Sequence, residues 1–275
     1  MKIRFILGLV LLSVIVLGFL HPLLTINIYT PIVSPKLEYS LVKAIYDTLL
    51  QPRIEYTGIN HTINLTAKSV ILRVGSSLVF VRNGCRGIIE FKDIASIPSE
   101  YTVTRENGIT VITAIGYEVY VDLPCNMSKF LIDARLSYVD MELLNNTIPE
   151  KLGIHAFGSI AKIIDNTSKA GVLSLTLEDS LLELTGRYHE YSGERALELK
   201  TTSSIAYLSL YTSKDVKVRI IKENIGGIID VEINGSYVYE KYYIDEEYYE
   251  SPMRLHIGIT GIGSGIKISI YRLEE

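Results

Sequence analysis

A short serine-led segment recurs four times in the second half of this 275-residue chain. Each copy starts with a serine and continues with alternating residues, and the steps between successive serines are 22, 21 and 24 residues. The four serines are Ser137, Ser159, Ser180 and Ser204. Another short apolar segment precedes each copy. Alternation is the period of a β-strand, and it places one set of side chains on a common face: Val139, Met141, Ala161, Ile163, Leu182, Leu184, Ala206 and Leu208.

A unit of two short strands cannot bury its apolar face alone, but a stack of such units builds one continuous core, as in a solenoid. An antiparallel sandwich, whose strands also recur at short intervals, is the alternative. Both are all-β folds. Five earlier segments also have the character of strands: Val70–Val74, Leu78–Val81, Gly87–Phe91, Thr110–Thr113 and Tyr117–Leu123.

Three further segments extend the pattern. Val119–Pro124 ends in Leu-Pro, Thr260–Ile268 contains Ser264-Gly265, and Val216–Ile221 is followed by Ile225-Gly-Gly227. With the four copies, they resemble the adhesin-like, "toast-rack" β-solenoid domains of bacteria and archaea. In that family, strand pairs with a t-x-S-G-x-[VI]-x-[VI] signature follow a strand that ends in Leu-Pro.

The resemblance covers roughly Ser69–Leu273. It implies an exported β-solenoid of a family that generally lacks an assigned enzymatic activity. Val119–Pro124 would lead the repeat, the segment ending at Gly227 would form the penultimate turn, and Thr260–Ile268 the last rung. The glycine after the serine is missing from the four middle copies. Either these turns avoid a left-handed backbone, or the register of the repeat is wrong.

The N-terminus predicts export. No charged residue lies between Arg4 and Lys36, and Lys2 and Arg4 would keep the start of the chain in the cytoplasm. About 20 apolar residues cross a bilayer, so residues 1–30 are predicted to be an uncleaved signal anchor. A cleaved signal peptide is the alternative, although no A-x-A-like site follows the apolar run. In both cases the rest is extracytoplasmic, and the anchor makes it a single-pass protein of the cell membrane.

Residues 31–53 are predicted to be a linker with a short amphipathic helix over Lys36–Gln51, and residues 54–275 to be the exported β-solenoid domain. Pro35 and Pro52 bracket the helix, and Leu37, Leu41, Val42, Ile45 and Leu49 share one face. This helix is expected to pack on the next domain. An interfacial helix on the membrane is less favoured because no basic face exists.

Six Asn-x-Ser/Thr sequons predict N-glycosylation, which requires an exported, exposed surface: Asn60, Asn64, Asn126, Asn145, Asn166 and Asn234. The two cysteines, Cys85 and Cys125, are a candidate disulfide outside the cytoplasm. Two buried thiols are the alternative, because sequence spacing does not give the Cα separation.

Charge excludes nucleic acid as the main partner. Without Lys2 and Arg4, the chain has 25 basic and 31 acidic residues, which gives a net charge of −6. The sequence therefore lacks the basic patch that binding to phosphates requires. The apolar content is also too high for disorder. One glutamine, no tryptophan and few methionines are typical of thermophile proteins, which with the sequons favours an archaeal source.

The segment Tyr237–Glu250 interleaves six tyrosines with acidic residues: Tyr237, Tyr239, Tyr242, Tyr243, Tyr248 and Tyr249. It is a candidate contact surface for a cell-surface protein or a glycan, because tyrosine offers a rigid ring with a polar tip. A calcium site is a weaker alternative, since EF-hand spacing is absent. The favoured interpretation is a hairpin that covers the end of the solenoid with its tyrosines.

No catalytic, cofactor or metal motif is recognisable. The five histidines lack ligand spacing. His189 is the best functional candidate among them because it lies in a polar loop. The cluster Gly261-Ile-Gly263 precedes a strand rather than the helix that a phosphate site needs. We therefore expect a membrane-tethered, N-glycosylated surface protein with a structural or adhesive role and no catalysis. A membrane-bound sensor and an exported glycan-acting enzyme using Glu246 and Glu247 are the alternatives.

Overall fold

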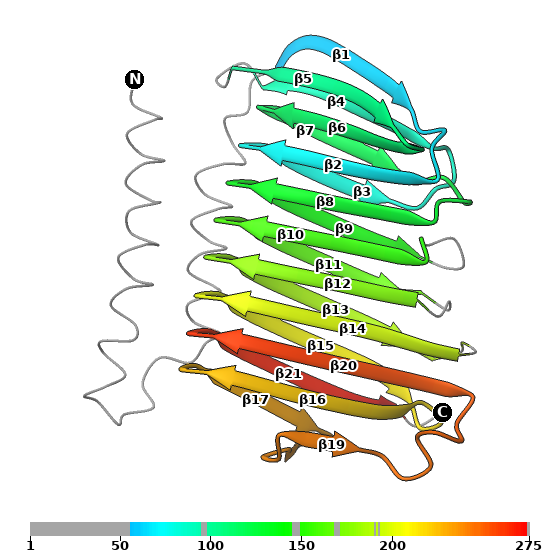
Figure 1. Cartoon of the computed structure of the whole chain (residues 1–275), viewed down its shortest axis with the longest axis vertical. Coiled ribbons are helices and arrows are strands. Elements are labelled where there is room, and N and C mark those ends of the chain that lie inside the picture. The colour runs from blue at the N-terminus through cyan, green and yellow to red at the C-terminus, as the bar shows by residue number, and fades with distance from the viewer. Residues whose placement is uncertain are drawn as a thin grey trace. The chain divides into compact units, whose positions relative to one another are not determined.

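The structure is a computed structural model that describes residues 56–94, 98–144, 149–167, 171–189, 191 and 193–273. These residues form two β-sheets that enclose one apolar core, and strands are stacked along the vertical axis of Figure 1. The prediction of an all-β, solenoid-like fold is confirmed. The predicted anchor over 1–30 and the predicted helix Lys36–Gln51 lie outside the described residues. Within the described ranges, no helix has the length and apolar character that crossing a membrane requires.

Ten strands form the sheet that faces the viewer in Figure 1. In spatial order they are β19 (Tyr242–Ile244), β16 (Lys217–Ile225), β20 (Met253–Ile262), β14 (Gly193–Thr202), β12 (Gly171–Glu178), β10 (Lys151–Phe157), β8 (Lys129–Arg135), β2 (Ser69–Gly75), β6 (Ile109–Ile115) and β5 (Glu100–Glu106).

Eleven strands form the sheet behind it. In spatial order they are β1 (Tyr56–Asn64), β4 (Ile88–Ile94), β7 (Tyr117–Asp122), β3 (Leu78–Arg82), β9 (Tyr138–Leu144), β11 (Ile160–Asn166), β13 (Leu181–Tyr188), β15 (Ile205–Ser213), β21 (Gly265–Leu273), β17 (Ile228–Ile233) and β18 (Ser236–Tyr237).

The repeating unit is a rung, which consists of one strand of the ten-stranded sheet and the next strand of the chain in the other sheet. Neighbouring rungs pair in parallel and in register, so Ile154 of β10 lies between Ile132 of β8 and Leu175 of β12. Because each rung repeats the same alternation, every second residue points inward. All eight side chains predicted to share one face are buried in the core.

The order of the rungs in space differs from their order in the sequence at both ends of the stack. The pair β2–β3 lies between β6–β7 and β8–β9. Likewise β20–β21 lies between β14–β15 and β16–β17. The predicted last rung is therefore the penultimate one in space, and the segment predicted as penultimate is outermost. Strand β7, predicted to lead the repeat, pairs with β3 and β4 rather than with the first copy.

Six buried serines form a ladder along one edge of the stack, where each rung turns from the ten-stranded into the eleven-stranded sheet. We call this the serine edge, and its serines are Ser77, Ser137, Ser159, Ser180, Ser204 and Ser264. The backbone N–H of each of the first five donates to the hydroxyl oxygen of the next, at 3.1–3.2 Å. Each hydroxyl donates to the carbonyl two residues before it, at 2.7–3.0 Å. One small side chain thus satisfies two backbone groups at a buried corner.

The turns of the serine edge do use a left-handed residue, but it precedes the serine. Leu136, Asp179 and Ser203 have φ of 48–49°, and Gly158 and Gly263 have φ of 56–57°. The N–H of this residue donates to a carbonyl of the next rung, as from Asp179 to Thr202 at 3.1 Å. The register of the repeat was therefore correct. A glycine after the serine is not needed in these turns, because the residue with the left-handed backbone precedes the serine. The expectation that these turns avoid a left-handed backbone was wrong.

One ion pair interrupts the apolar core. Arg195 of β14 and Asp165 of β11 both occupy inward positions, are 1% and 0% exposed, and lie 2.5 Å apart (Nη2 to Oδ2). Tyr188 of β13 and Thr167 also donate to the carboxylate, at 3.0 and 2.7 Å. This group therefore joins the two sheets through the core. Asp165 continues the inward alternation of Ala161 and Ile163.

We predict that Ser180→Ala lowers the free energy of unfolding by about 1–3 kcal/mol, because it leaves the buried N–H of Ser159 without an acceptor. The denaturant midpoint at pH 7 measures this loss. Ser174→Ala is the matched control, since Ser174 occupies a half-exposed position of β12, and it should change stability by less than about 0.5 kcal/mol. Equal effects of both variants would show that the ladder contributes no stability.

We predict that Arg195→Met costs about 3–5 kcal/mol, because it leaves the Asp165 carboxylate buried and uncompensated. The triple variant Asp165→Leu, Tyr188→Phe, Arg195→Met removes the whole polar group and should recover most of that loss. Urea denaturation of both proteins measures the difference. A triple variant that is less stable than Arg195→Met would contradict this account.

Candidate binding surface

The segment Tyr237–Glu250, here called the tyrosine cap, covers the end of the core beyond β16 and β17. Tyr248 and Val238 are buried, and Tyr243 is half-buried against the core. The other four tyrosines are exposed: Tyr237, Tyr239, Tyr242 and Tyr249. The segment therefore closes the solenoid, and it leaves four rings at the surface. The prediction that the segment covers the end of the solenoid agrees with these positions, but the segment is not a single hairpin, because β18 pairs with β17 and β19 pairs with β16. Its role as a contact surface stays a prediction.

Asp245 holds the tyrosine cap in place. Its carboxylate accepts hydrogen bonds from the Val218 N–H at 2.6 Å and from the Tyr243 hydroxyl at 2.7 Å, and it pairs with Arg272. Only 8% of the Asp245 side chain is exposed. Burial and this hydrogen bond raise the pKa of Tyr243 to about 12. The cap is thus fixed to β16 and to β21, which gives its exposed rings a defined position.

Four side chains of three kinds meet on the outer face beside the cap, and we call them the arginine–tyrosine patch: Arg219, Tyr242, Tyr249 and His256. Arg219 of β16 and His256 of β20 are register partners on adjacent strands. The Arg219 guanidinium carbon lies 5.6 Å from the centroid of the Tyr242 ring. Tyr242 shares a hydrogen bond with Tyr249, which raises the pKa of Tyr249.

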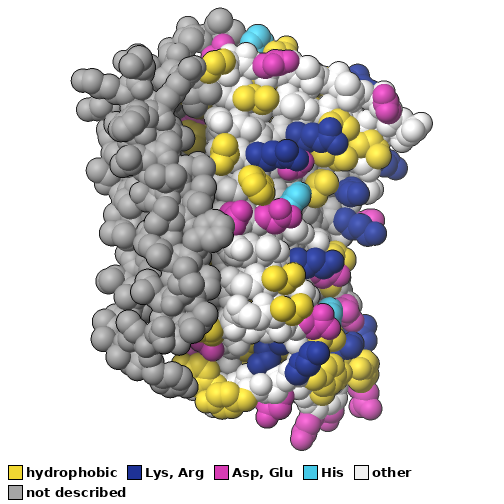
Figure 2. Space-filling model, turned by 60° about the vertical axis from the view of Figure 1, so that its left-hand side comes forward, with side chains coloured by type: hydrophobic (Ala, Val, Ile, Leu, Met, Phe, Trp, Pro, Cys, Tyr) yellow, Lys and Arg dark blue, Asp and Glu magenta, His cyan; other side chains and the backbone are white. Residues whose placement is uncertain are grey.

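The patch has unused hydrogen-bonding capacity. Arg219 Nε and His256 Nδ1 are buried and have no hydrogen-bond partner, and none of the described carboxylates pairs with Arg219. Burial and the charge of Arg219 lower the pKa of His256, so its imidazole is neutral at pH 7. Nearby, Arg254 Nε lies 3.8 Å from the Glu194 carboxylate. Figure 2 shows hydrophobic, basic and acidic side chains next to one another at the lower end of this face.

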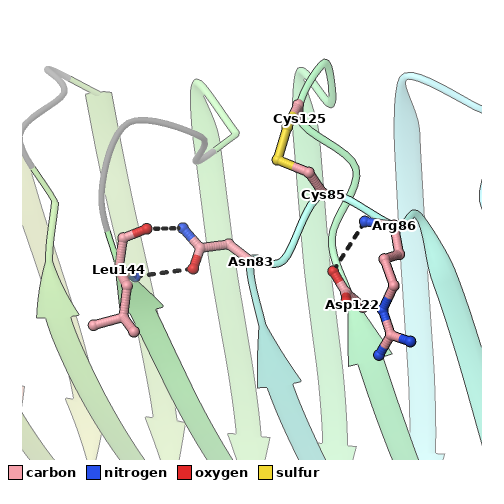
Figure 3. Close-up of a disulfide and its surroundings, with 6 residues drawn as sticks. All are labelled: Asn83, Cys85, Arg86, Asp122, Cys125 and Leu144. Carbon is pink, nitrogen blue, oxygen red and sulfur yellow. Dashed lines mark hydrogen bonds and ion pairs between the residues drawn. A yellow bond between two sulfur atoms is a disulfide. The ribbon is translucent and has the colours of Figure 1, made fainter.

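The disulfide between Cys85 and Cys125 is present, with the Cα atoms 4.7 Å apart. It lies at the edge opposite the serine edge, where the chain leaves the eleven-stranded sheet, and we call this the return edge (Figure 3). Arg86 beside it donates from Nε to Asp122 at 2.8 Å. The Asn83 amide exchanges two hydrogen bonds with the backbone of Leu144. The alternative of two buried thiols is thereby contradicted.

The described sequons also lie at the return edge. Asn64 ends β1, Asn126 follows Cys125, Asn166 ends β11, and Asn234 forms the turn after β17. Asn64, Asn126 and Asn234 are exposed, whereas Asn166 is half-buried with an unpaired Oδ1. Asn145 and the side chain of Asn60 lie outside the described residues. Glycosylation at these positions stays a prediction.

The remaining candidates do not come together as a catalytic site. His155 lies on the outer face of β10 between Asp133 and Glu178, at 3.9 and 3.4 Å. Glu247 pairs with Lys217 at 3.8 Å in an exposed turn that also holds Glu246. His189 is exposed, and its carbonyl accepts a hydrogen bond from the Ser213 hydroxyl at 3.1 Å. In the described part of the chain, no three His, Cys, Asp or Glu side chains are grouped as a metal site requires.

The sequence analysis did not single out Arg219, and it assigned no function to His256. The tyrosine segment was visible because its residues are consecutive. Arg219 is 23 residues before Tyr242 and joins it only because β16 and β19 pair antiparallel. Alternation along β16 places Arg219 on the outer face, so its orientation was predictable, but its neighbours were not.

Two solved structures are similar to this chain. One is a putative cell adhesion protein from Clostridium sporogenes, with 10% sequence identity over 77% of this chain and 99% of the other, and a TM-score of 0.43. The second is a putative adhesin from Parabacteroides distasonis, with 9% identity over 78% and 96% and a TM-score of 0.27. No protein-family model matches the sequence, and neither does any curated protein. At these identities and TM-scores, the likenesses carry no inference about ligand or activity.

We predict that Tyr248→Phe leaves the melting temperature at pH 7 unchanged or raises it, because the buried Tyr248 hydroxyl has no hydrogen-bond partner. Burial raises the pKa of Tyr248 to about 12, so its ionisation is opposed in the folded state. The stability linked to this group is present below pH 10 and is lost as the pH rises toward 12. The variant should therefore lose less stability over that range.

Tyr243→Phe is the matched variant for this test. It removes the hydrogen bond to Asp245 and should cost about 1 kcal/mol at pH 7. Melting temperatures between pH 7 and pH 11 compare the two proteins. A larger loss at pH 7 for Tyr248→Phe than for Tyr243→Phe would contradict the assignment of their hydroxyls.

Proposed function

We propose that this chain is a cell-surface protein whose β-solenoid lies outside the cytoplasm and has a structural or adhesive role without catalysis. The apolar N-terminal segment would hold it to the membrane, and the exposed sequons would carry N-linked glycans. The tyrosine cap would provide its contact surface, toward a cell-surface protein or a glycan.

The observation that carries this proposal is the disulfide between Cys85 and Cys125. Both residues are exposed, and a solvent-accessible disulfide persists in oxidising compartments but is rare in the reducing cytosol. The bond closes a 40-residue separation, for which chain entropy predicts about 3–4 kcal/mol of stabilisation. Export thus supplies the condition under which this end of the solenoid is most stable.

A second line of support is the location of the sequons. Among the sequons whose side chains the structure describes, the three exposed ones lie at the return edge, together with the disulfide, and away from the serine edge. Glycans at Asn64, Asn126 and Asn234 would therefore project from one side of the stack. Glycans at these three positions would not cover the serine edge or the outer face of the ten-stranded sheet.

We predict that a membrane-impermeant amine reagent labels this protein on intact host cells, because Lys129 and Lys151 are exposed in β8 and β10. In the same cells, Asn126→Gln should lower the mass of the protein by one glycan, whereas Asn166→Gln should leave it unchanged. Mass spectrometry of the purified protein measures both the label and the glycan.

A cytoplasmic protein that stays unlabelled until lysis is the control for cell integrity. Labelling of this chain only after lysis would place the solenoid inside the cell and overturn the proposal. Free, alkylatable Cys85 and Cys125 in the protein isolated from cells would remove its main support.

A further inference from the structure

The arginine–tyrosine patch combines a flat aromatic surface with polar groups that have no protein partner. Tyr242 and Tyr249 are 46% and 65% exposed, whereas Tyr248 of the same cap is buried. Tyr249 also packs edge-on against Tyr248, with ring centroids 5.4 Å apart. Since Tyr248 is buried, this contact holds the exposed Tyr249 ring in place on its inner side.

The strand register builds a shallow floor beside these rings. Gly258 of β20 lies between Glu198 of β14 and Ile221 of β16, and Ile221 is the register partner of Tyr242. A Cβ at Gly258 would meet only the His256 ring, at 3.7 Å, so open space lies above this glycine. The absence of a side chain there leaves room next to the tyrosines.

The polar groups around this floor include both donors and acceptors. Arg219 can only donate hydrogen bonds, and the carboxylates of Glu194 and Glu198 can only accept them. Neutral His256 can do either. The charged groups that act on Tyr248, Tyr249 and His256 are two arginines and two glutamates: Arg219, Arg254, Glu194 and Glu198. Their formal charges cancel. The patch therefore favours an uncharged ligand with many hydroxyl groups over an anion or a cation.

From this geometry we infer that the arginine–tyrosine patch binds a neutral sugar ring of a glycan, with one face of the ring stacked on Tyr242 and Tyr249. The hydroxyl groups of the sugar accept from Arg219 and donate to Glu198, and His256 completes the polar rim. This inference names a ligand class for the adhesive role proposed above and rests on that proposal.

Direct titration of the purified full-length chain in detergent tests this binding. The probes are three neutral oligosaccharides, mannotriose, cellotriose and chitotriose, with trigalacturonic acid as the anionic comparison. We expect saturable binding of at least one neutral probe with a Kd of about 1 mM or tighter, and at least tenfold weaker binding of the acid. Because the chain contains no tryptophan, tyrosine fluorescence follows the protein without interference, and saturation-transfer NMR detects the bound sugar.

Tyr242→Ala and Tyr249→Ala should each weaken binding by about tenfold or more, and Arg219→Met should weaken it by a similar factor. The matched controls are Tyr237→Ala and Tyr239→Ala, which remove exposed rings from the same cap that contact each other and not Arg219. They should bind as the unaltered chain does. The melting temperature of each variant shows that it is folded, and Tyr249→Ala, which alters an exposed turn, remains informative if Tyr242→Ala unfolds.

Three results would overturn the inference: no saturable binding of any neutral probe, preferential binding of trigalacturonic acid, or binding that the Tyr249→Ala variant leaves unchanged. Because these titrations use purified protein, they do not depend on where the chain resides. If they fail while intact cells are labelled, the surface role stands and only the ligand class is wrong. If labelling fails while the sugar binds, the location is wrong and the site stands.

Discussion

The hydroxyl groups of six buried serines, one at each turn from β2–β3 to β20–β21 in the spatial order of the stack, are the contacts on which the stack depends. At each of these turns the chain changes sheets, so the backbone N–H of the serine cannot join either strand ladder. The serine hydroxyl of the next rung accepts a hydrogen bond from that N–H and donates one to a carbonyl of its own rung. Repeated through six rungs, this exchange lets an apolar core continue past a bend that would otherwise leave buried polar groups unpaired.

The serine ladder does not cover the apolar core at the two ends of the stack, so each end needs its own closing structure. At one end the chain adds antiparallel strands and a disulfide, and at the other it adds the tyrosine cap, held by Asp245. The cap is larger than closure requires, because Tyr248 and Val238 already cover the core. Closure of the core therefore does not explain the exposed rings, and two of them, Tyr242 and Tyr249, belong to the sugar site proposed above.

The sequence was a good guide wherever a local period decides the structure. The strand positions, the inward faces and the serine register follow from alternation and from a repeat of 21–24 residues, as Leu182 and Leu184 show. It was a poor guide wherever distant segments meet. In space, β20–β21 lies before β16–β17, the reverse of their order in the sequence, because β21 rather than β17 pairs with β15. Every rung has the same alternation, so the sequence pattern does not distinguish these two arrangements. The partners of Arg219 and the pairing of Arg195 with Asp165 depend on tertiary neighbours in the same way.

The internal position of β20–β21 sets a rule for how such a chain can change in length. A rung appended after Leu273 would have no free parallel edge to join, because β21 already pairs on both sides with β15 and β17. Duplication of a middle unit, such as the one that begins at Ser159, would place the new strands between parallel strands with the same alternation. The structures that close the two ends of the stack would be unchanged. Paralogues of different height are therefore expected to differ by whole turns in the middle of the array, while their end pieces stay constant.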